Sequence, residues 1–116
     1  MPFFNWDELE SDIITPSYSL GKGPAVKGAR IEVALIRYPA GSVATPHAHP
    51  NEQVQVVIRG KGKYRVGEEE KVLGPGEAVL IPANTEHELQ ILEELEVINC
   101  KDVVPGWSVK NARWEK

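Results

Sequence analysis

From Ile31 onward the sequence is a series of short apolar runs, rich in valine and isoleucine, that are interrupted by glycine, proline or asparagine. β-Branched residues favour strands, and these interrupting residues favour turns between strands. Gly74, Pro75 and Gly76 force one tight turn, and Pro82 ends the next run where a missing N–H does least harm. The runs span residues 31–38, 53–59, 62–66, 69–73, 77–81, 87–92 and 95–101. This pattern predicts an all-β barrel or sandwich.

The chain has 116 residues, and a domain of this length buries somewhat over about 60% of its unfolded surface. We therefore expect one domain with a barrel at residues 31–101. Residues 1–30 are expected to form a helix or arm that packs on the barrel or on a partner. Residues 102–116 are expected to form a C-terminal arm. The single cysteine, Cys100, excludes an internal disulfide, and its apolar neighbours predict a buried structural thiol.

Residues 1–15 contain the one helical candidate of the chain. Asn5 is a residue type that caps helix N-termini, and Trp6, Leu9 and Ile13 would share one helical face. We predict a short helix there, in which Trp6 anchors the segment to the barrel.

The net charge is −4, and the basic residues are scattered along the chain, which argues against a nucleic-acid surface. The acidic runs at 68–70 and 93–94 are interpreted as solvated ends of hairpins. No apolar run approaches the length of a membrane span, and residues 1–5 do not resemble the start of a signal peptide. We therefore expect a cytoplasmic protein without a membrane partner.

All three histidines of the chain fall within one spacing pattern. It reads Gly41-x5-His47-x-His49-x3-Gln53-x6-Gly60, followed by Gly76-x5-Pro82-x4-His87. In a strand, alternate side chains share a face, so His47 and His49 would project the same way. Gln53 can offer an amide oxygen from a neighbouring strand, and His87 comes from a distant one. Three imidazoles and one oxygen suit manganese, iron, cobalt, nickel, copper or zinc, so we predict one divalent transition metal per chain.

A less specific interpretation exists for these histidines. A lone histidine in a small domain is more often a surface or core residue than a ligand, and a His-x-His pair alone is a weak signal. Gly41, Gly60, Gly76 and Pro82 sharpen the signal, because each stands at a turn that the pattern requires and no histidine is left over. The alternative is a barrel that carries the same residues and binds no ion.

The blocks Gly41–Gly60 and Gly76–His87 resemble the two motifs of the cupin (RmlC-like) superfamily. The resemblance implies an antiparallel double-stranded β-helix, or jelly-roll barrel. Gln53 stands where the family usually has glutamate, Asn84 where glycine is usual, and Ile91 where asparagine is usual. Asparagine tolerates the left-handed backbone conformation better than other non-glycine residues. The Gln53 change removes a negative charge, so a bound ion would be a stronger Lewis acid.

Small bacterial cupins with this His-His-Gln-His set are similar to this chain in size. Some resemble enzymes of unsaturated uronate breakdown, and others resemble oxygenases or lyases. The resemblance thus favours a metalloenzyme that activates a carbonyl, hydroxy-acid or sugar-derived substrate, or dioxygen. The resemblance implies that such an enzyme would be a metal-dependent oxygenase (dioxygenase), an isomerase or a lyase. The alternative is a module that binds a sugar acid without chemistry, since fold alone does not settle function.

Four protein ligands on a six-coordinate ion leave two positions open, which is typical of catalytic rather than structural sites. The metal-bound water is therefore the first candidate for acid or base chemistry. The side-chain candidates are Gln55, Tyr38 and Tyr64, which are expected inside the barrel. Three carboxylates adjoin the ligands in sequence but are expected to point away from the cavity. These are Glu52, Glu86 and Glu88.

The sequence of the strand that begins at Gln53 also bears on whether two copies of the chain associate. If Gln53 and Gln55 face the interior, then Val54, Val56 and Ile58 form an apolar stripe on the outside. Either the N-terminal segment of this chain or a second subunit must cover that stripe. Small cupins resemble dimers in which an N-terminal strand crosses over, so we expect a homodimer.

Overall fold

Two long strands organise the protein, whose computed structural model describes residues 2–14, 18–107 and 113–114. β6 (Gln53–Val66) and β9 (His87–Asp102) pair antiparallel along almost their whole length. Each combines two runs that the sequence predicts as separate strands. The pairing shifts register between Val57 and Gly62, and there both strands pass from one half of the barrel to the other without leaving the sheet.

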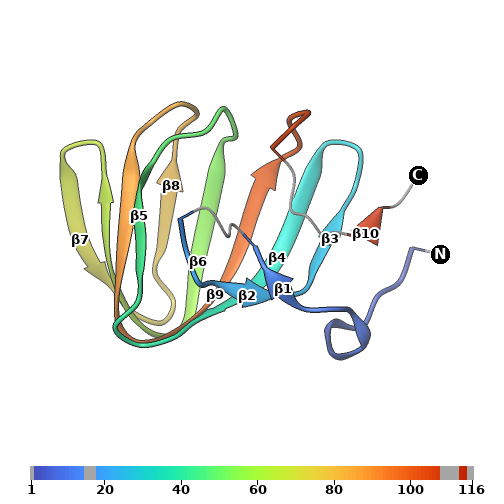
Figure 1. Cartoon of the computed structure of the whole chain (residues 1–116), viewed down its shortest axis with the longest axis horizontal. Coiled ribbons are helices and arrows are strands. Elements are labelled where there is room, and N and C mark those ends of the chain that lie inside the picture. The colour runs from blue at the N-terminus through green and yellow to red at the C-terminus, as the bar shows by residue number, and fades with distance from the viewer. Residues whose placement is uncertain (1, 15–17, 108–112, 115–116) are drawn as a thin grey trace.

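One half of the barrel contains the end of β9 and the start of β6. There β9 pairs with β4 (Ile31–Tyr38), and β6 pairs with β8 (Ala78–Ile81). In the other half, the start of β9 pairs with β5 (Val43–His47), and the end of β6 pairs with β7 (Glu69–Leu73). Figure 1 shows β5 and β7 toward one end of the molecule and β3 and β10 toward the other. This arrangement confirms the prediction of an antiparallel all-β jelly-roll barrel.

Short strands extend the sheet at β4. Both β2 and β3 pair with β4, while β1 pairs with β2 and β10 pairs with β3 in the one parallel pair among the described strands. Their bounds are Asp12–Ile13 for β1, Lys22–Gly23 for β2, Ala25–Lys27 for β3 and Arg113–Trp114 for β10. Strands of two or three residues are too short to show an alternating pattern, so the sequence did not predict them.

The predicted boundaries are best where turns flank a strand at both ends. The runs 31–38 and 69–73 coincide with β4 and β7, and the run 77–81 begins one residue before β8. The apolar runs do not include β5, because the segment contains Pro46 and little apolar alternation, and only the His47-x-His49 spacing indicated a strand there. Its strand conformation depends instead on pairing with β9, which joins Val43 to Gln90 and His47 to His87.

The predicted N-terminal helix is a single 3₁₀ turn, η1 (Trp6–Glu8), and this part of the prediction was wrong. Asn5 does cap the turn, since its side chain accepts a hydrogen bond from the Asp7 N–H at 2.9 Å. The segment cannot continue as a helix because Ile13 pairs in β1 with Lys22 of β2. Among the described residues, no helix has the length and apolar character needed to cross a bilayer.

The interior of the first half is arranged in layers across β4, β9 and β6. Residues in register on these three strands form an apolar layer and two layers with polar side chains. The layers are Ile36–Val97–Val57, then Ala34–Asn99–Gln55, and then Glu32–Lys101–Gln53. Neighbouring residues of a layer project to the same side of the sheet. The barrel is therefore apolar at its middle and polar at the end that carries Gln53.

Gly60 permits the bend at which β6 crosses between the halves. Its φ is 89°, and a Cβ there would lie 1.9 Å from the carbonyl oxygen of Glu94 on β9. Asn84 takes a left-handed φ of 60°, as expected for asparagine in place of glycine. Gly41 also has a positive φ, 81°, but nothing lies within 4 Å of its Cβ position.

A comparison of two alanine variants tests the role of the close approach between Gly60 and Glu94. Gly41→Ala should lower the free energy of unfolding by about 1 kcal/mol, because only the backbone conformation is strained. Gly60→Ala should lower it by at least about 3 kcal/mol, because the two strands must also move apart. Urea unfolding of both variants measures the difference, and equal losses would contradict the tight crossing at Gly60.

The outer face of β6 carries the expected apolar stripe. Val54 and Ile58 remain 37% and 46% exposed, and Leu80, beside Val54 on β8, is 57% exposed. Cys100 lies on the other side of Val54 and is only partly buried. The thiol is therefore less buried than expected, because its register with Val54 places it on the outer face of β9. The described part of the chain leaves the stripe in contact with water.

The homodimer remains a prediction, and this stripe is the surface that it would bury. Light scattering at micromolar concentration should give twice the chain mass. Ile58→Glu should convert the dimer to a monomer, because a carboxylate would lose its hydration in the interface. Val43→Glu is the matched control, since Val43 is 41% exposed on β5 in the other half. A monomer mass for the unmodified chain would remove the prediction.

Candidate metal centre

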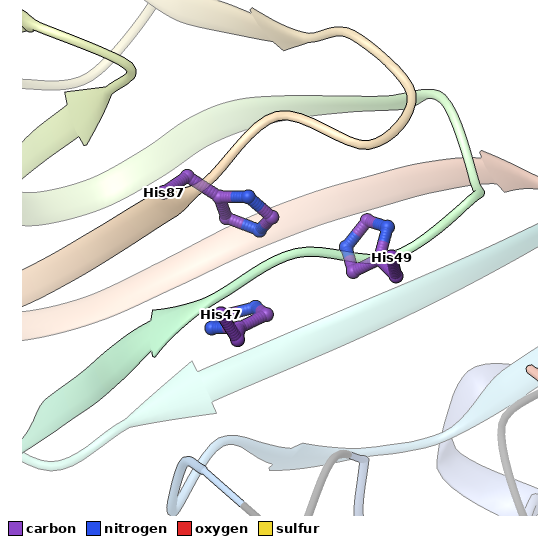
Figure 2. A group of neighbouring side chains, drawn as sticks. All are labelled: His47, His49 and His87. Atoms are coloured by element: carbon purple, nitrogen blue, oxygen red, sulfur yellow. The ribbon is translucent and has the colours of Figure 1, made fainter.

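The three histidines meet at the polar end of the barrel. His47 is the last residue of β5, His49 lies in the loop beyond it, and His87 begins β9 directly opposite His47. One ring nitrogen of each histidine lies within 4.8 Å of those of the other two. The ring centroids are 4.2 Å apart for His47 and His87, and 4.9 Å apart for His49 and His87. Figure 2 shows the three rings turned toward a common space.

The strand that was expected to carry both His47 and His49 ends at His47. Strict alternation is therefore not what brings His49 to the site. The loop instead returns His49 into the barrel, where its side chain is 5% exposed and its backbone carbonyl accepts a hydrogen bond from the Asn84 N–H at 2.7 Å. Asn84 lies just before His87, so this bond connects the two segments that supply the histidines.

Backbone hydrogen bonds define the chemical state of all three rings. Each Nδ1 lies against the carbonyl oxygen of a residue two positions away. The partners are Thr45 for His47 at 2.6 Å, Asn51 for His49 at 3.1 Å and Thr85 for His87 at 2.8 Å. A carbonyl only accepts, so each Nδ1 carries the proton and each Nε2 keeps a lone pair. This is the tautomer that binds a metal through Nε2.

Burial favours the neutral form of each ring. It lowers the pKa of His47 and of His49, and it lowers the pKa of His87 to about 4. Lys101 acts in the same direction on His47 and His49, and the neighbouring rings do so on His47 and His87, because positive charges disfavour one another. The imidazoles are therefore neutral at neutral pH, which is the form that donates to a metal ion.

Gln53 completes the donor set. Its Oε1 lies 3.1 Å from Nε2 of His49, and both atoms are acceptors in the tautomer defined above. Two facing acceptors repel unless a cation lies close to both. Nε2 of His87 is also buried and has no hydrogen-bond partner among the described residues. A divalent ion would satisfy these three atoms, so the residues fit the metal that the sequence predicts.

A chain of hydrogen bonds holds the Gln53 amide in this orientation. Its Nε2 donates to Oδ1 of Asn99 at 2.5 Å, and Nε2 of Gln55 donates to the same oxygen at 3.1 Å. Oε1 of Gln55 accepts from the Tyr64 hydroxyl at 2.5 Å. The network determines which end of each amide is donor and which is acceptor, and it turns the Gln53 oxygen toward His49.

Gln55, Tyr38 and Tyr64, the side-chain candidates for acid or base chemistry, are all buried and line the cavity. Burial raises the pKa of Tyr38 to about 12 and raises that of Tyr64 further above its ordinary value. Both phenols therefore keep their protons at neutral pH. Tyr64 donates to Oε1 of Gln55, and Tyr38 accepts from Nε2 of Gln55. Gln55 does not titrate, and its contacts make it a positioning residue.

The three carboxylates that neighbour the ligands in sequence do not turn to the histidines. Glu86 and Glu88 form ion pairs with Arg65 at 3.0 and 2.6 Å, although Glu88 contributes to the cavity wall. Glu52 is exposed, and its backbone N–H donates to Asp102 at 2.6 Å. This agrees with the expectation that these carboxylates point away from the ligand cluster.

The sequence did not single out three residues that the structure brings to the site. Tyr18 stacks on His47 with ring centroids 3.7 Å apart, and its backbone carbonyl accepts a hydrogen bond from Thr45. Asn99 and Lys101 project into the cavity from β9. Alternation from the buried Leu95 and Val97 would have placed both polar residues inside the barrel. No sequence signal places Tyr18 there, because it reaches the site from the N-terminal segment.

Comparisons with known proteins agree with the fold. A family model described as Cupin domain matches residues 34–99. The structure of KdgF from Halomonas sp. is 24% identical with a TM-score of 0.78, and the match covers 91% of this chain and 96% of that chain. An RmlC-like cupin from Shewanella frigidimarina is 20% identical with a TM-score of 0.76, with 91% and 94% covered.

A more distant similarity is to oxalate decarboxylase from Bacillus subtilis, which contains Mn(II) centres. It is 17% identical with a TM-score of 0.72, and the match covers 85% of this chain and 28% of that one. No curated protein matches the sequence. At these identities the structural likeness establishes the fold.

The ligand assignment predicts the effect of removing one imidazole. His49→Ala should weaken binding of a divalent transition ion at least about 100-fold while leaving the barrel folded, because the loop keeps its backbone bonds. Elemental analysis after dialysis measures the metal, and circular dichroism checks the fold. Glu52→Ala is the matched control, since this exposed carboxylate lies beside Gln53 in the sequence. Full metal content in His49→Ala would refute the assignment.

Proposed function

The chain belongs to the cupin domain family. We propose that it is a metalloenzyme that holds one divalent transition ion in the three-histidine centre. The ligands are Nε2 of His47, His49 and His87 together with Oε1 of Gln53. The observation that carries the proposal is the convergence of neutral imidazoles whose Nδ1 atoms are all occupied by backbone carbonyls. The same arrangement leaves the buried Nε2 of His87 without a partner among the described residues.

The donor set determines what the ion would contribute. Three neutral imidazoles and a neutral amide leave its positive charge uncompensated by any ligand, so when bound it would act as a strong Lewis acid toward a carbonyl or hydroxyl oxygen. Four protein ligands leave positions for a substrate that binds through two oxygen atoms. The likeness of the fold to an oxalate decarboxylase with Mn(II) centres is compatible with this use.

The cavity residues favour a polar substrate. The Tyr38 and Tyr64 hydroxyls stay protonated, and they lie on either side of the Gln55 amide at 3.4 and 2.5 Å. Tyr64 donates its proton to Oε1 of Gln55, whereas the Tyr38 hydroxyl accepts from Nε2 of Gln55 and keeps its own proton for a substrate oxygen atom. We therefore assign the chain to redox-neutral chemistry on a hydroxy or keto acid or a sugar-derived substrate, as an isomerase or lyase.

One experiment distinguishes this function from that of a dioxygenase and from that of a binding module. Protein purified without added metal is analysed for its elements and then incubated with 2-hydroxy acids, 2-keto acids and unsaturated uronates, under nitrogen and under air. We expect conversion of one class at equal rates in both atmospheres, followed by proton NMR, and at least about 100-fold slower conversion by His49→Ala.

The other outcomes contradict the proposal in different ways. Conversion only under air, together with bound iron, manganese, nickel or copper, would make the protein a dioxygenase. Tight binding of a sugar acid that is recovered unchanged would make it a binding module. If the protein is supplied in turn with manganese, iron, cobalt, nickel, copper and zinc and binds none of them, it is not a metalloenzyme.

A further inference from the structure

A lysine side chain is buried beside the candidate metal centre. Lys101 projects inward from β9 in register with Gln53 of β6, and its side chain is only 7% exposed. It lines the same cavity as the three histidines.

A buried cation next to a cation site is unfavourable unless a negative charge accompanies it. Glu32, on the other side of Lys101, is 2% exposed, and its Oε1 lies 3.6 Å from Nζ of Lys101. This distance makes an ion pair but exceeds that of a good hydrogen bond. An ammonium group has three N–H donors, so Lys101 can bind a second anion without releasing Glu32.

The charges of the site are unbalanced once a divalent ion binds. Lys101 and Glu32 cancel one another, Arg65 and Glu88 cancel one another at the cavity wall, and the four ligands are neutral. The remaining negative charge belongs to Glu86, whose side chain is 63% exposed outside the cavity lining, so solvent screens it. Both positive charges of the ion therefore remain without a compensating group among the described residues that line the cavity. Gln53 is the cause, since a glutamate at this position would supply one negative charge. A negatively charged substrate would restore the balance.

The size of the cavity limits which part of a substrate can reach Lys101. About 40 Å³ is open to the centres of water molecules, which corresponds to only a few water-sized groups at about 10–15 Å³ each. A carboxylate with a neighbouring oxygen atom is of that size, whereas a whole sugar ring is not. The charged end of a substrate is therefore the part that fits the cavity.

We propose that Lys101 is the residue that selects anionic substrates, by binding the carboxylate of a 2-hydroxy or 2-keto acid whose oxygen atoms also approach the three-histidine centre. This inference rests on the proposed function and narrows it to a carboxylate-bearing substrate. Neutral polyols and sugars lack the group that Lys101 recognises, so they bind weakly whatever their fit to the cavity.

Binding to the cobalt-loaded protein tests the role of Lys101 without requiring turnover. Glycolate is the probe, and ethylene glycol is its neutral counterpart. Visible absorption of Co²⁺ and calorimetry report the dissociation constants. We expect Lys101→Met to raise the dissociation constant of glycolate at least about 10-fold, since a hydrogen bond to a charged group is lost. Ethylene glycol should bind equally weakly to both proteins, and Lys101→Arg should restore part of the glycolate affinity.

Two further variants separate this role from a structural one. Lys63→Met is the matched control, because Lys63 pairs with Glu70 on the surface at 3.0 Å and should not affect glycolate. The double variant Glu32→Met with Lys101→Met replaces the whole buried pair by apolar side chains, an exchange that proteins often tolerate. It should lose glycolate affinity as Lys101→Met does, even if the single variant does not fold.

The outcomes also distinguish failure of this inference from failure of the proposed function. If the variants without Lys101 bind Co²⁺ and bind glycolate as tightly as the unmodified protein, the anion-binding role is overturned and the metal centre stands. If the unmodified protein does not bind Co²⁺, the metal centre fails and this inference fails with it. Binding of Co²⁺ should be unchanged or tighter in Lys101→Met, because a nearby positive charge is removed.

Discussion

The lengthwise pairing of β6 with β9 is the constraint on which the rest of the structure depends. These two strands belong to both halves of the barrel, so one register determines which side chains meet inside each half. It places Gln53 beside Lys101 and Gln55 beside Asn99, and it sets the start of β9 where His87 can face His47 of β5. Strand register therefore places His47, His87 and Gln53, and the loop after β5 adds His49.

Around the centre, hydrogen bonds decide the chemistry of each donor. Backbone carbonyls hold the proton on Nδ1 of every histidine, and Asn99 turns the oxygen of Gln53 toward His49. Burial keeps the imidazoles neutral and the phenols of Tyr38 and Tyr64 protonated. The result is a cluster of uncharged donors, which is the basis of our proposal that an anionic substrate balances the charge of a bound ion.

Much of this could be predicted from the sequence, and the misses have physical causes. The fold class follows from the short β-branched runs, and the histidine cluster follows from their spacing. The N-terminal helix was wrong because Ile13 pairs in β1 instead. Alternation also fails across the bend in β6, where the register shift moves the inward-facing positions from odd numbers such as Gln55 to even ones such as Tyr64.

The sequence by itself determined the all-β class, the turns at glycine and Asn84, and the identity of the three imidazole donors. These depend on local backbone preferences and on side-chain chemistry, which each residue carries with it. Only the tertiary structure decided that Asn99 orients Gln53, that Tyr18 stacks on His47, and that a lysine accompanies the centre. Such contacts join residues that are far apart in the chain, and they exist only once strand register and burial bring those residues together.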